Sequence, residues 1–346
     1  MSTLKAFLER LIAREDLAAD EAAQLLTSLT SPDVSPALAG ALLVALRSKG
    51  ETAEELRGFA AAMRSLARKP EIANVAGAVD IVGTGGDRSG SINISTGASL
   101  LAAAAGLQVV KHGNRSISSR AGSADVLEAL GVPMPLDEAA AGACFAQHGF
   151  TFLFAPYYHP AMKAIAPVRA ALGVRTVFNV LGPLSNPAAP PFHVIGAFSL
   201  PMARLMAQAL CATDITRAFV VHGAGGWDEP TPVGPFTLLD VRPGSIEECT
   251  RSASDYGLAN CSPEELAGAD AQHNAEVLRR VLRGEERGAQ RAALVLSAAL
   301  ALQVTGVEPD ARAAAARAGA AIDSGAAGRL LANLSTLAFD TAMARA

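Results

Sequence analysis

The sequence predicts an α/β protein, with a small, all-helical N-terminal domain and a larger domain whose mostly parallel sheet is flanked by helices. The first seventy residues carry helical apolar stripes and no strand signal. From Val79 onward, short β-branched runs alternate with helical patterns, which is typical of a parallel sheet covered on both faces. The chain then ends in alanine-rich helical segments. Because Lys69-Pro70 closes the first pattern, we expect domains at residues 1–70 and 71–346, with some later helices packing against the first.

The N-terminal helices have clear sequence signals. Ser35-Pro36 is an N-cap followed by proline at the first helical position, and this helix should run to Gly50. Thr52 and Glu55 form a capping box for a further helix that ends near Leu66. One apolar face of the first helix has the spacing i, i+3, i+4, i+7, i+8, given by Leu4, Phe7, Leu8, Leu11 and Ile12.

The larger domain shows six candidate strands with helical patterns between and after them. The strands are Val79–Val82, Gln108–Lys111, Thr151–Phe154, His193–Phe198, Ala218–Val221 and Phe236–Val241. The helices are Ala98–Ala105, Ala124–Leu130, Leu136–Gln147, Ala161–Leu172, Met202–Leu210, Asn274–Leu282, Ala289–Gln303, Ala311–Ile322 and Arg329–Leu337.

Composition argues against several classes of protein. The formal net charge is −4 and no basic block occurs, so a general nucleic-acid binder is not expected. No apolar run is long enough to span a bilayer, and charged residues interrupt the N-terminus where a signal peptide would be apolar. The four cysteines lack metal or redox spacing: Cys144, Cys211, Cys249 and Cys261. We therefore expect a cytoplasmic protein that binds neither nucleic acid nor membrane.

The segment from Asp80 to Thr96 is the most informative in the chain. An apolar run, Ile81-Val82, leads into a loop with three glycines, and polar residues then open the alanine-rich helix that Gly106 ends. Unpaired amides and the helix dipole at such a junction favour an anion. The spacing matches neither a Rossmann fingerprint nor a P-loop. We therefore expect a phosphate-bearing ligand bound in a different way.

A second polar segment, residues 111–123, follows the second expected strand. It contains cations, an imidazole, an amide and hydroxyls, all of which can donate to phosphate or ribose oxygens. Since the carboxyl ends of parallel strands share one edge of a sheet, it should lie beside the glycine loop.

A third segment carries the adjacent carboxylates Asp228 and Glu229 after the glycine-rich run Gly223–Gly226. Adjacent side chains on a strand point to opposite faces, but in a loop both can turn toward one cation. Carboxylates together with substrate phosphates are ligands that Mg²⁺ prefers. The pair is informative only because it follows a third sheet-edge strand, since most such pairs are surface charges.

A fourth segment, residues 157–187, supplies Arg169 on an expected helix. An arginine that faces the cleft holds a carboxylate with two parallel hydrogen bonds, whereas one that faces solvent has no such role. His159, before a proline, is equally suited to a structural hydrogen bond. The remaining histidines, His148, His193, His222 and His273, have no identifiable partners.

Taken together, these motifs resemble the anthranilate phosphoribosyltransferases. They occur in the order of that family, over nearly the whole chain: Gly83-Thr84-Gly85-Gly86-Asp87, Asn93-Ile94-Ser95-Thr96, Lys111 to Arg115, His159-Pro160-Ala161-Met162-Lys163, Arg175-Thr176-Val177-Phe178-Asn179, Leu181-Gly182-Pro183-Leu184 and Asp228-Glu229. Departures are Arg88, where the family tolerates a small residue, and Gly97, where alanine is usual.

The resemblance implies transfer of a phosphoribosyl group from 5-phosphoribosyl 1-diphosphate (PRPP) to anthranilate, in tryptophan biosynthesis, by a Mg²⁺-dependent homodimer. It implies that anthranilate is bound by Gly83, Asn114 and Arg169, and the metal by Ser95, Asp228 and Glu229. It implies that PRPP is bound by Gly83, Gly86, Asp87, Ser91, Asn93, Ile94, Ser95, Thr96, Lys111, His112, Gly113, Asn114, Arg115, Ser116, Ile117, Ser118, Ser119 and Ser123.

The expected reaction needs neutralisation of the leaving pyrophosphate and two reactants held in line. Anthranilate's amine already carries a lone pair, so no residue is assigned as a general acid or base; His112 is the one candidate worth testing. Two alternatives are weighed. A pyrimidine nucleoside phosphorylase needs neither the carboxylate pair nor a site for an aromatic carboxylate, and a non-catalytic nucleic-acid-binding relative disagrees with the net charge.

Overall fold

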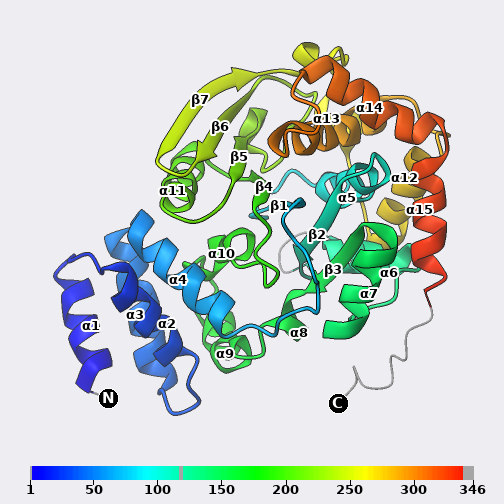
Figure 1. The fold of residues 1–346 in the computed structure, drawn as a ribbon. Coiled ribbons are helices and arrows are strands. Elements are labelled where there is room, and N and C mark those ends of the chain that lie inside the picture. Colours follow the sequence, from blue (N-terminus) through cyan, green and yellow to red (C-terminus); the bar gives the residue numbers. More distant parts are fainter. Residues whose placement is uncertain (1, 117–119, 338–346) are drawn as a thin grey trace.

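The computed structural model describes residues 2–116 and 120–337, and it places a helical lobe beside a larger domain built on one sheet (Figure 1). The predicted fold class is confirmed. Within these residues no helix combines the length and the hydropathy that crossing a membrane requires.

Four helices form the N-terminal lobe. The predicted caps are confirmed: Ser35 Oγ accepts a hydrogen bond from Leu38 N (3.3 Å), and Thr52 and Glu55 cap the fourth helix reciprocally. The second helix lies in a stretch for which the sequence predicted helix without setting bounds. The elements are α1 (Ser2–Ile12), α2 (Ala19–Leu29), α3 (Pro36–Lys49) and α4 (Ala53–Ser65).

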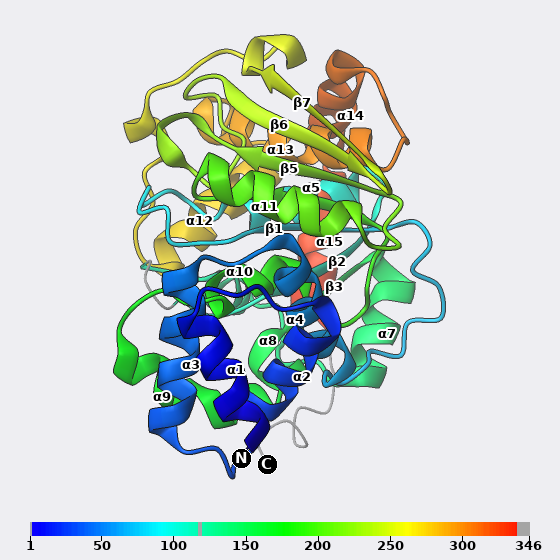
Figure 2. The ribbon, with the colours of Figure 1, turned by 90° about the vertical axis from the view of Figure 1, so that its left-hand side faces the viewer.

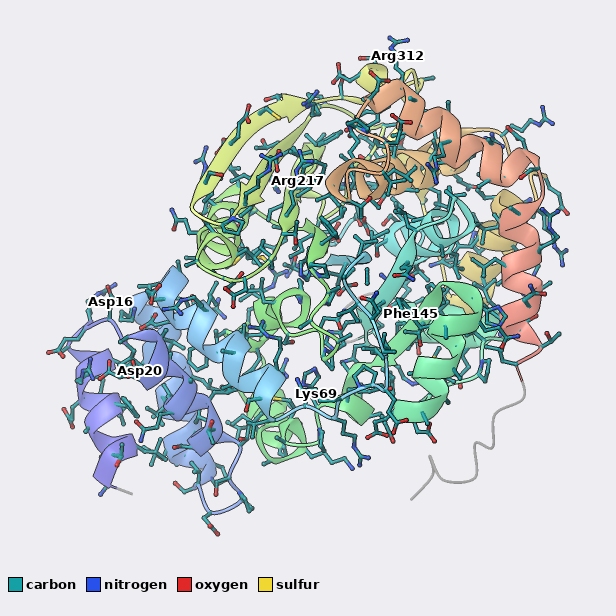
Figure 3. The ribbon with its side chains drawn as sticks, viewed as in Figure 1. Asp16, Asp20, Lys69, Phe145, Arg217 and Arg312 are labelled. Atoms are coloured by element: carbon teal, nitrogen blue, oxygen red, sulfur yellow. The ribbon has the colours of Figure 1, made fainter. Side chains whose placement is uncertain are left out.

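The sheet has seven strands in the order β3-β2-β1-β4-β5-β6-β7, of which the first five are parallel and the last two antiparallel. Arg217, labelled in Figure 3, lies on β5 and donates two hydrogen bonds of 2.6 and 2.8 Å to Asp240 on β6, which supports the antiparallel half of the sheet. The strands are β1 (Ala78–Gly83), β2 (Gln108–Gly113), β3 (Phe150–Phe154), β4 (Phe192–Gly196), β5 (Arg217–His222), β6 (Phe236–Arg242) and β7 (Ser245–Arg251).

Two of these strands differ from the prediction. The seventh was missed because β7 is an edge strand whose side chains are almost all exposed, so its sequence, SIEECTR, carries no apolar alternation. The fourth was expected to continue to Phe198, but β4 ends at Gly196, where the chain turns toward the next helix.

Helices cover both faces of the sheet. Successive side chains of β4 point to opposite faces of the sheet and so enter different apolar clusters. Val194 belongs to the cluster that includes α5–α7 and α12–α15, and Ile195 belongs to the cluster that includes α9–α11. The helices are α5 (Ile94–Ala104), α6 (Ser123–Ala129), α7 (Glu138–His148), α8 (Ala155–Tyr158), α9 (Met162–Leu172), α10 (Phe178–Leu181), α11 (Leu200–Cys211), α12 (Ala271–Leu282), α13 (Ala289–Val304), α14 (Ala311–Asp323) and α15 (Ala326–Ser335).

The N-terminal lobe shares its core with later helices. Buried side chains of α1–α4 and of α9–α11 form one apolar cluster, and Figure 2 shows α9 beside α3. The division at residue 70 stays a prediction, because this cluster crosses it.

Candidate functional site

Three glycines let a loop lie across the ends of three strands. Gly83 and Gly196 pair at the carboxyl ends of β1 and β4, and Gly223 follows β5. A Cβ on Gly196 would overlap the carbonyl oxygen of Asp228, one on Gly83 would meet the Asp228 carboxylate, and one on Gly223 would overlap the carbonyl oxygen of Glu229. The sequence reasoning missed Gly196, because a lone glycine at the end of a strand has many explanations.

This close approach brings the two carboxylates against the glycine loop and α5. Asp228 Oδ2 accepts a hydrogen bond from Gly85 N, and Asp228 N donates to Asp87 Oδ2 (3.3 Å). Glu229 Oε1 accepts from Ser95 N (3.2 Å) at the first turn of α5. The third predicted segment therefore contacts the first, as the sheet-edge argument expected.

Ionising these carboxyls without a cation is unfavourable. Burial, followed by the charges of Asp87 and Glu229, raises the pKa of Asp228 well above its ordinary value. Burial also raises the pKa of Glu229 to about 7, although Lys111 opposes this shift. A divalent cation would remove the repulsion, so the donor chemistry fits Mg²⁺. Among the described residues no three His, Cys, Asp or Glu side chains are arranged as a complete metal site, so such an ion would need oxygens from water or substrate.

The glycine loop is ordered by short-range hydrogen bonds. Asp87 Oδ1 accepts from Ser89 N (3.1 Å), and Ser89 Oγ lies 3.1 Å from Ser91 Oγ. Gly86 has φ +75°, which favours glycine, but the neighbouring Arg88 adopts φ +62° with a full side chain.

Polar side chains tie the start of α5 to other segments. Asn93 Nδ2 donates to Ala121 O (3.1 Å), and Asn93 Oδ1 accepts from Asn274 Nδ2 (2.9 Å) on α12. The buried Thr96 Oγ1 has no hydrogen-bond partner within the described part of the chain. The predicted residues Asn93–Thr96 thus lie between the glycine loop and the second polar segment.

The second segment begins with two buried side chains. Lys111 is 1% exposed and its Nζ donates to Ile81 O (2.5 Å). Burial lowers the pKa of Lys111, while Asp80 and Glu229 act in the opposite direction. His112 Nδ1 lies 3.1 Å from Gly182 O, and burial lowers the pKa of His112 to about 3. At neutral pH this imidazole is uncharged and holds no acidic proton to transfer.

The rest of the second segment turns partly away from the carboxylates. Arg115 forms ion pairs of 2.8 Å with Asp125 and Glu128 of α6. Asn114 Oδ1 accepts from Arg115 N (2.7 Å), and Ser123 Oγ donates to Asn114 O (3.3 Å). The expected ligands Ile117, Ser118 and Ser119 lie outside the described residues.

Arg169 on α9 is a half-buried cation that packs against an aromatic ring. Its guanidinium lies 5.0 Å above the ring centroid of Phe178, and burial lowers its pKa. Within residues 2–116 and 120–337, no acidic side chain pairs with it in an ion pair. A partly desolvated, unpaired cation favours an anionic ligand.

Arg175 contacts both the N-terminal lobe and the glycine loop, and the sequence reasoning did not assign it this role. Its guanidinium donates to Gly86 O and stacks 4.1 Å from the ring centroid of Phe198. Its carbonyl oxygen accepts a hydrogen bond from Arg47 of α3. The only sequence signal was its place within a longer motif.

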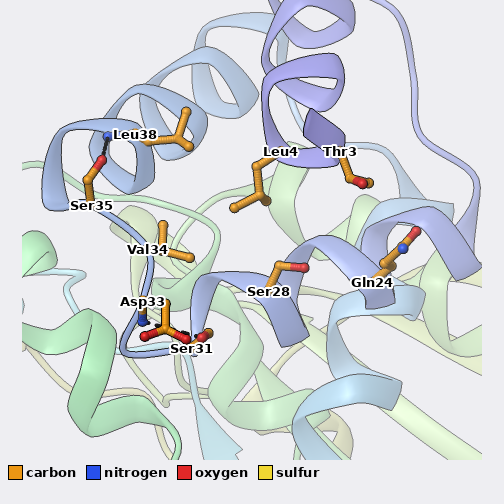
Figure 4. Close-up of a pocket in the computed structure, with 9 residues that line it drawn as sticks. All are labelled: Thr3, Leu4, Gln24, Ser28, Ser31, Asp33, Val34, Ser35 and Leu38. Carbon is orange, nitrogen blue, oxygen red and sulfur yellow. Dashed lines mark hydrogen bonds between the residues drawn. The ribbon is translucent and has the colours of Figure 1, made fainter. Parts of the chain in front are cut away.

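A hollow of about 270 Å³ lies elsewhere, within the N-terminal lobe (Figure 4). Thr3 and Leu4 of α1, Gln24 and Ser28 of α2, and Leu38 of α3 contribute to its walls. It contains none of the predicted site residues.

Comparison with known proteins agrees with this geometry. Residues 75–328 match the model described as "Glycosyl transferase family, a/b domain", and residues 5–67 match its helical bundle domain. The chain is 46% identical over 327 residues to the anthranilate phosphoribosyltransferase of Rubrobacter xylanophilus, covering 94% of each chain.

Solved structures show the same similarity. The anthranilate phosphoribosyltransferase of Thermus thermophilus superposes with a TM-score of 0.89 at 42% identity, covering 95% of this chain and 98% of the other. The Saccharomyces cerevisiae enzyme, in complex with PRPP and Mg, gives 0.88 at 25% identity and covers 97% and 99%. None of these three bears the name of a nucleoside phosphorylase or a nucleic-acid-binding protein. The chain belongs to the anthranilate phosphoribosyltransferase family of glycosyltransferases.

Proposed function

We propose that the sheet edge formed by residues 83–96, 111–123 and 228–229 performs the family's reaction. The 5-phosphoribosyl group of PRPP moves to the amino nitrogen of anthranilate, giving N-(5-phosphoribosyl)anthranilate and pyrophosphate, a step of tryptophan biosynthesis. The observation that carries this proposal is the approach of Asp228 and Glu229 to Gly85 N and Ser95 N across the glycine ends of the strands.

The residues of this edge have complementary roles toward PRPP. Amides of the glycine loop and the first turn of α5, with Thr96 Oγ1 and the Lys111 ammonium, would bind its phosphates. Asp228 and Glu229, with Ser95, would hold Mg²⁺. When bound there, the ion supplies charge neutralisation for the departing pyrophosphate.

The chain's own part is to hold the reactants in line and to exclude water. Positive charge develops on the ribose ring as the bond to pyrophosphate breaks, and nearby carboxylates stabilise such charge. Anthranilate's nitrogen attacks with its own lone pair, so no general base is required. The low pKa of His112, about 3 because of burial, agrees with that reading, since an imidazole of such low basicity is a poor acceptor for the amine proton.

Arg169 would receive the carboxylate of anthranilate with its guanidinium, which lies over the ring of Phe178. Asn114 and Gly83 would complete this subsite. Arg115 would contact a phosphate of PRPP after its ion pairs with Asp125 and Glu128 break on substrate binding.

We also propose that the protein is a cytoplasmic homodimer. Within each chain, the boundary between the two domains would lie at about residue 70. Ile12 on α1 and Val44 on α3 are 63% and 42% exposed, which leaves large apolar side chains on the lobe for a second copy. The net charge of −4 gives no support to nucleic-acid binding.

The experiment is to mix the protein with PRPP, Mg²⁺ and anthranilate and to follow the loss of anthranilate fluorescence. Arg169→Ala should raise the KM for anthranilate about tenfold or more, because the carboxylate loses a charge-assisted pair, and should change the KM for PRPP much less. Arg204→Ala is the matched control, since Arg204 pairs with Glu248 on the surface. Equal changes in both KM values would refute the assigned role of Arg169, and no turnover by the unmodified protein would refute the function.

A further inference from the structure

β1 and β2 separate partway along the sheet. Their paired residues are Ala78 with Gln108 and Val79 with Val109, and the pairing stops there. By contrast, β1 pairs with β4 over five positions, and β2 pairs with β3 over five. The gap therefore opens between the strand that leads to the glycine loop and the strand that leads to the second polar segment.

Three side chains bridge this gap. Asp80 Oδ1 accepts from His112 N (3.3 Å), and Asp80 Oδ2 accepts from Asn186 Nδ2 (2.8 Å). Asn186 Nδ2 also donates to Val110 O (2.9 Å). Lys111 Nζ donates to Ile81 O (2.5 Å). Backbone groups that a continuous parallel ladder would pair are thus satisfied by side chains instead.

The bridge is closed to solvent. Asp80 is 0% exposed, and Asn186 and Lys111 are 1% exposed. Asn186 is itself held, because its Oδ1 accepts from Ala188 N (3.0 Å). Burial raises the pKa of Asp80 to about 6, and the nearby Lys111 acts against that shift. The bridge therefore places an acidic and a basic side chain, Asp80 and Lys111, in one buried network.

Such a network is a poor way to stabilise a sheet. Burying two charges costs desolvation free energy that their attraction roughly offsets, and an apolar strand pair of similar volume is often at least as stable. The arrangement is useful if the ammonium group must be held at one place. The geometry fits this, because Lys111 Nζ is fixed by its hydrogen bond to Ile81 O on the strand that also carries Asp80.

We propose that Asp80 and Asn186 are positioning residues for phosphoribosyl transfer, which fix the separation of β1 and β2 and hold the Lys111 ammonium group where the diphosphate of PRPP binds. Neither residue touches substrate; both act through Lys111 and the adjoining backbone. This inference rests on the proposed function.

The test combines Asp80→Asn with Lys111→Met. Asparagine retains the shape of Asp80 and an acceptor for His112 N, but it removes the carboxylate charge and the acceptor for Asn186 Nδ2. We expect Asp80→Asn to weaken PRPP affinity about tenfold, measured by calorimetry, the scale typical of residues that hold a ligating group. The KM for anthranilate should stay within about twofold of the unmodified value, because Asp80 acts on the PRPP side of the site.

The Lys111→Met background separates positioning from general damage. If Asp80 acts through Lys111, adding Asp80→Asn to Lys111→Met should cost no further PRPP affinity. The same loss in both backgrounds, no loss in either, or equal loss toward both substrates would overturn the proposal.

Two further variants complete the design. Thr151→Val is the matched control, since Thr151 is a buried polar residue on β3 outside the bridge, and it should leave PRPP affinity unchanged. Should Asp80→Asn fold poorly, Asn186→Ser tests the same coupling from the other side. A protein that binds and turns over neither substrate would instead refute the proposed function.

Discussion

Replacing Glu229 by glutamine should make the metal-free protein more stable above neutral pH while removing most of its activity. The carboxyl of Glu229 accepts from Ser95 N, and a glutamine oxygen can keep that hydrogen bond. What the substitution removes is the ionisable group, whose pKa burial raises to about 7 from an ordinary value of 4.5. Stability and turnover therefore should change in opposite directions.

The magnitude follows from proton linkage. A carboxyl with a raised folded-state pKa binds its proton more tightly in the folded protein than in the unfolded chain. Its contribution to stability is fully present below pH 4.5 and is lost as pH rises through about 7. At 1.36 kcal/mol for each pKa unit, this shift is worth up to about 3 kcal/mol. Because Glu229 keeps some contact with solvent, screening reduces the expectation to about 1–3 kcal/mol.

The assay is urea unfolding at pH 5 and pH 8 in the presence of EDTA. The unmodified protein should lose about 1–3 kcal/mol more between the two pH values than Glu229→Gln does. Glu247→Gln, on the exposed strand β7, is the control. Turnover of Glu229→Gln with PRPP and Mg²⁺ should fall about 100-fold, as loss of a metal ligand predicts. If the free energy of unfolding changed equally with pH in the two proteins, the pKa of Glu229 would not be raised in the folded state.

Two further substitutions test the backbone of the site. Gly196→Ala should cost about 1–3 kcal/mol of stability and most of the turnover, because its Cβ would displace the carbonyl of Asp228; Gly77→Ala, with room for a Cβ, should do neither. Arg88→Gly should raise the free energy of unfolding by about 1 kcal/mol, since φ +62° strains a residue with a side chain. Urea denaturation measures both, and an unchanged midpoint for either would contradict its explanation.

Local signals were sufficient to predict much of this fold. The caps at Ser35 and Thr52 depend on residues three positions apart, and the structure confirms both. The parallel strands were found from their β-branched runs. The exposed strand β7 was not found, because nothing in its composition records pairing with β6. Strand order likewise depends on pairing between distant segments, such as β1 with β4.

The candidate site divides in a similar way. The residues Asp228 and Glu229 were found because they follow a strand and a glycine run. The requirement for glycine at position 196 could not be predicted, because the carbonyl group that a Cβ there would overlap belongs to Asp228, 32 positions further along the chain. The ion pairs of Arg115 could not be predicted either. Arg115 turns toward α6 because Asp125 and Glu128, one helical turn apart, both lie within reach of its guanidinium.

The C-terminal helices support the first turn of α5 from the side of the core. A Cβ on Gly97 of α5 would lie 2.6 Å from Leu294 Cδ2 and 2.8 Å from Leu278 Cδ2, so glycine at this position lets α13 and α12 pack closely against α5. This accounts for one departure from the family's usual alanine. Four residues before Gly97, Asn93 accepts a hydrogen bond from Asn274 of α12. The same packing that stabilises the tail therefore fixes the first turn of α5, whose amide meets Glu229.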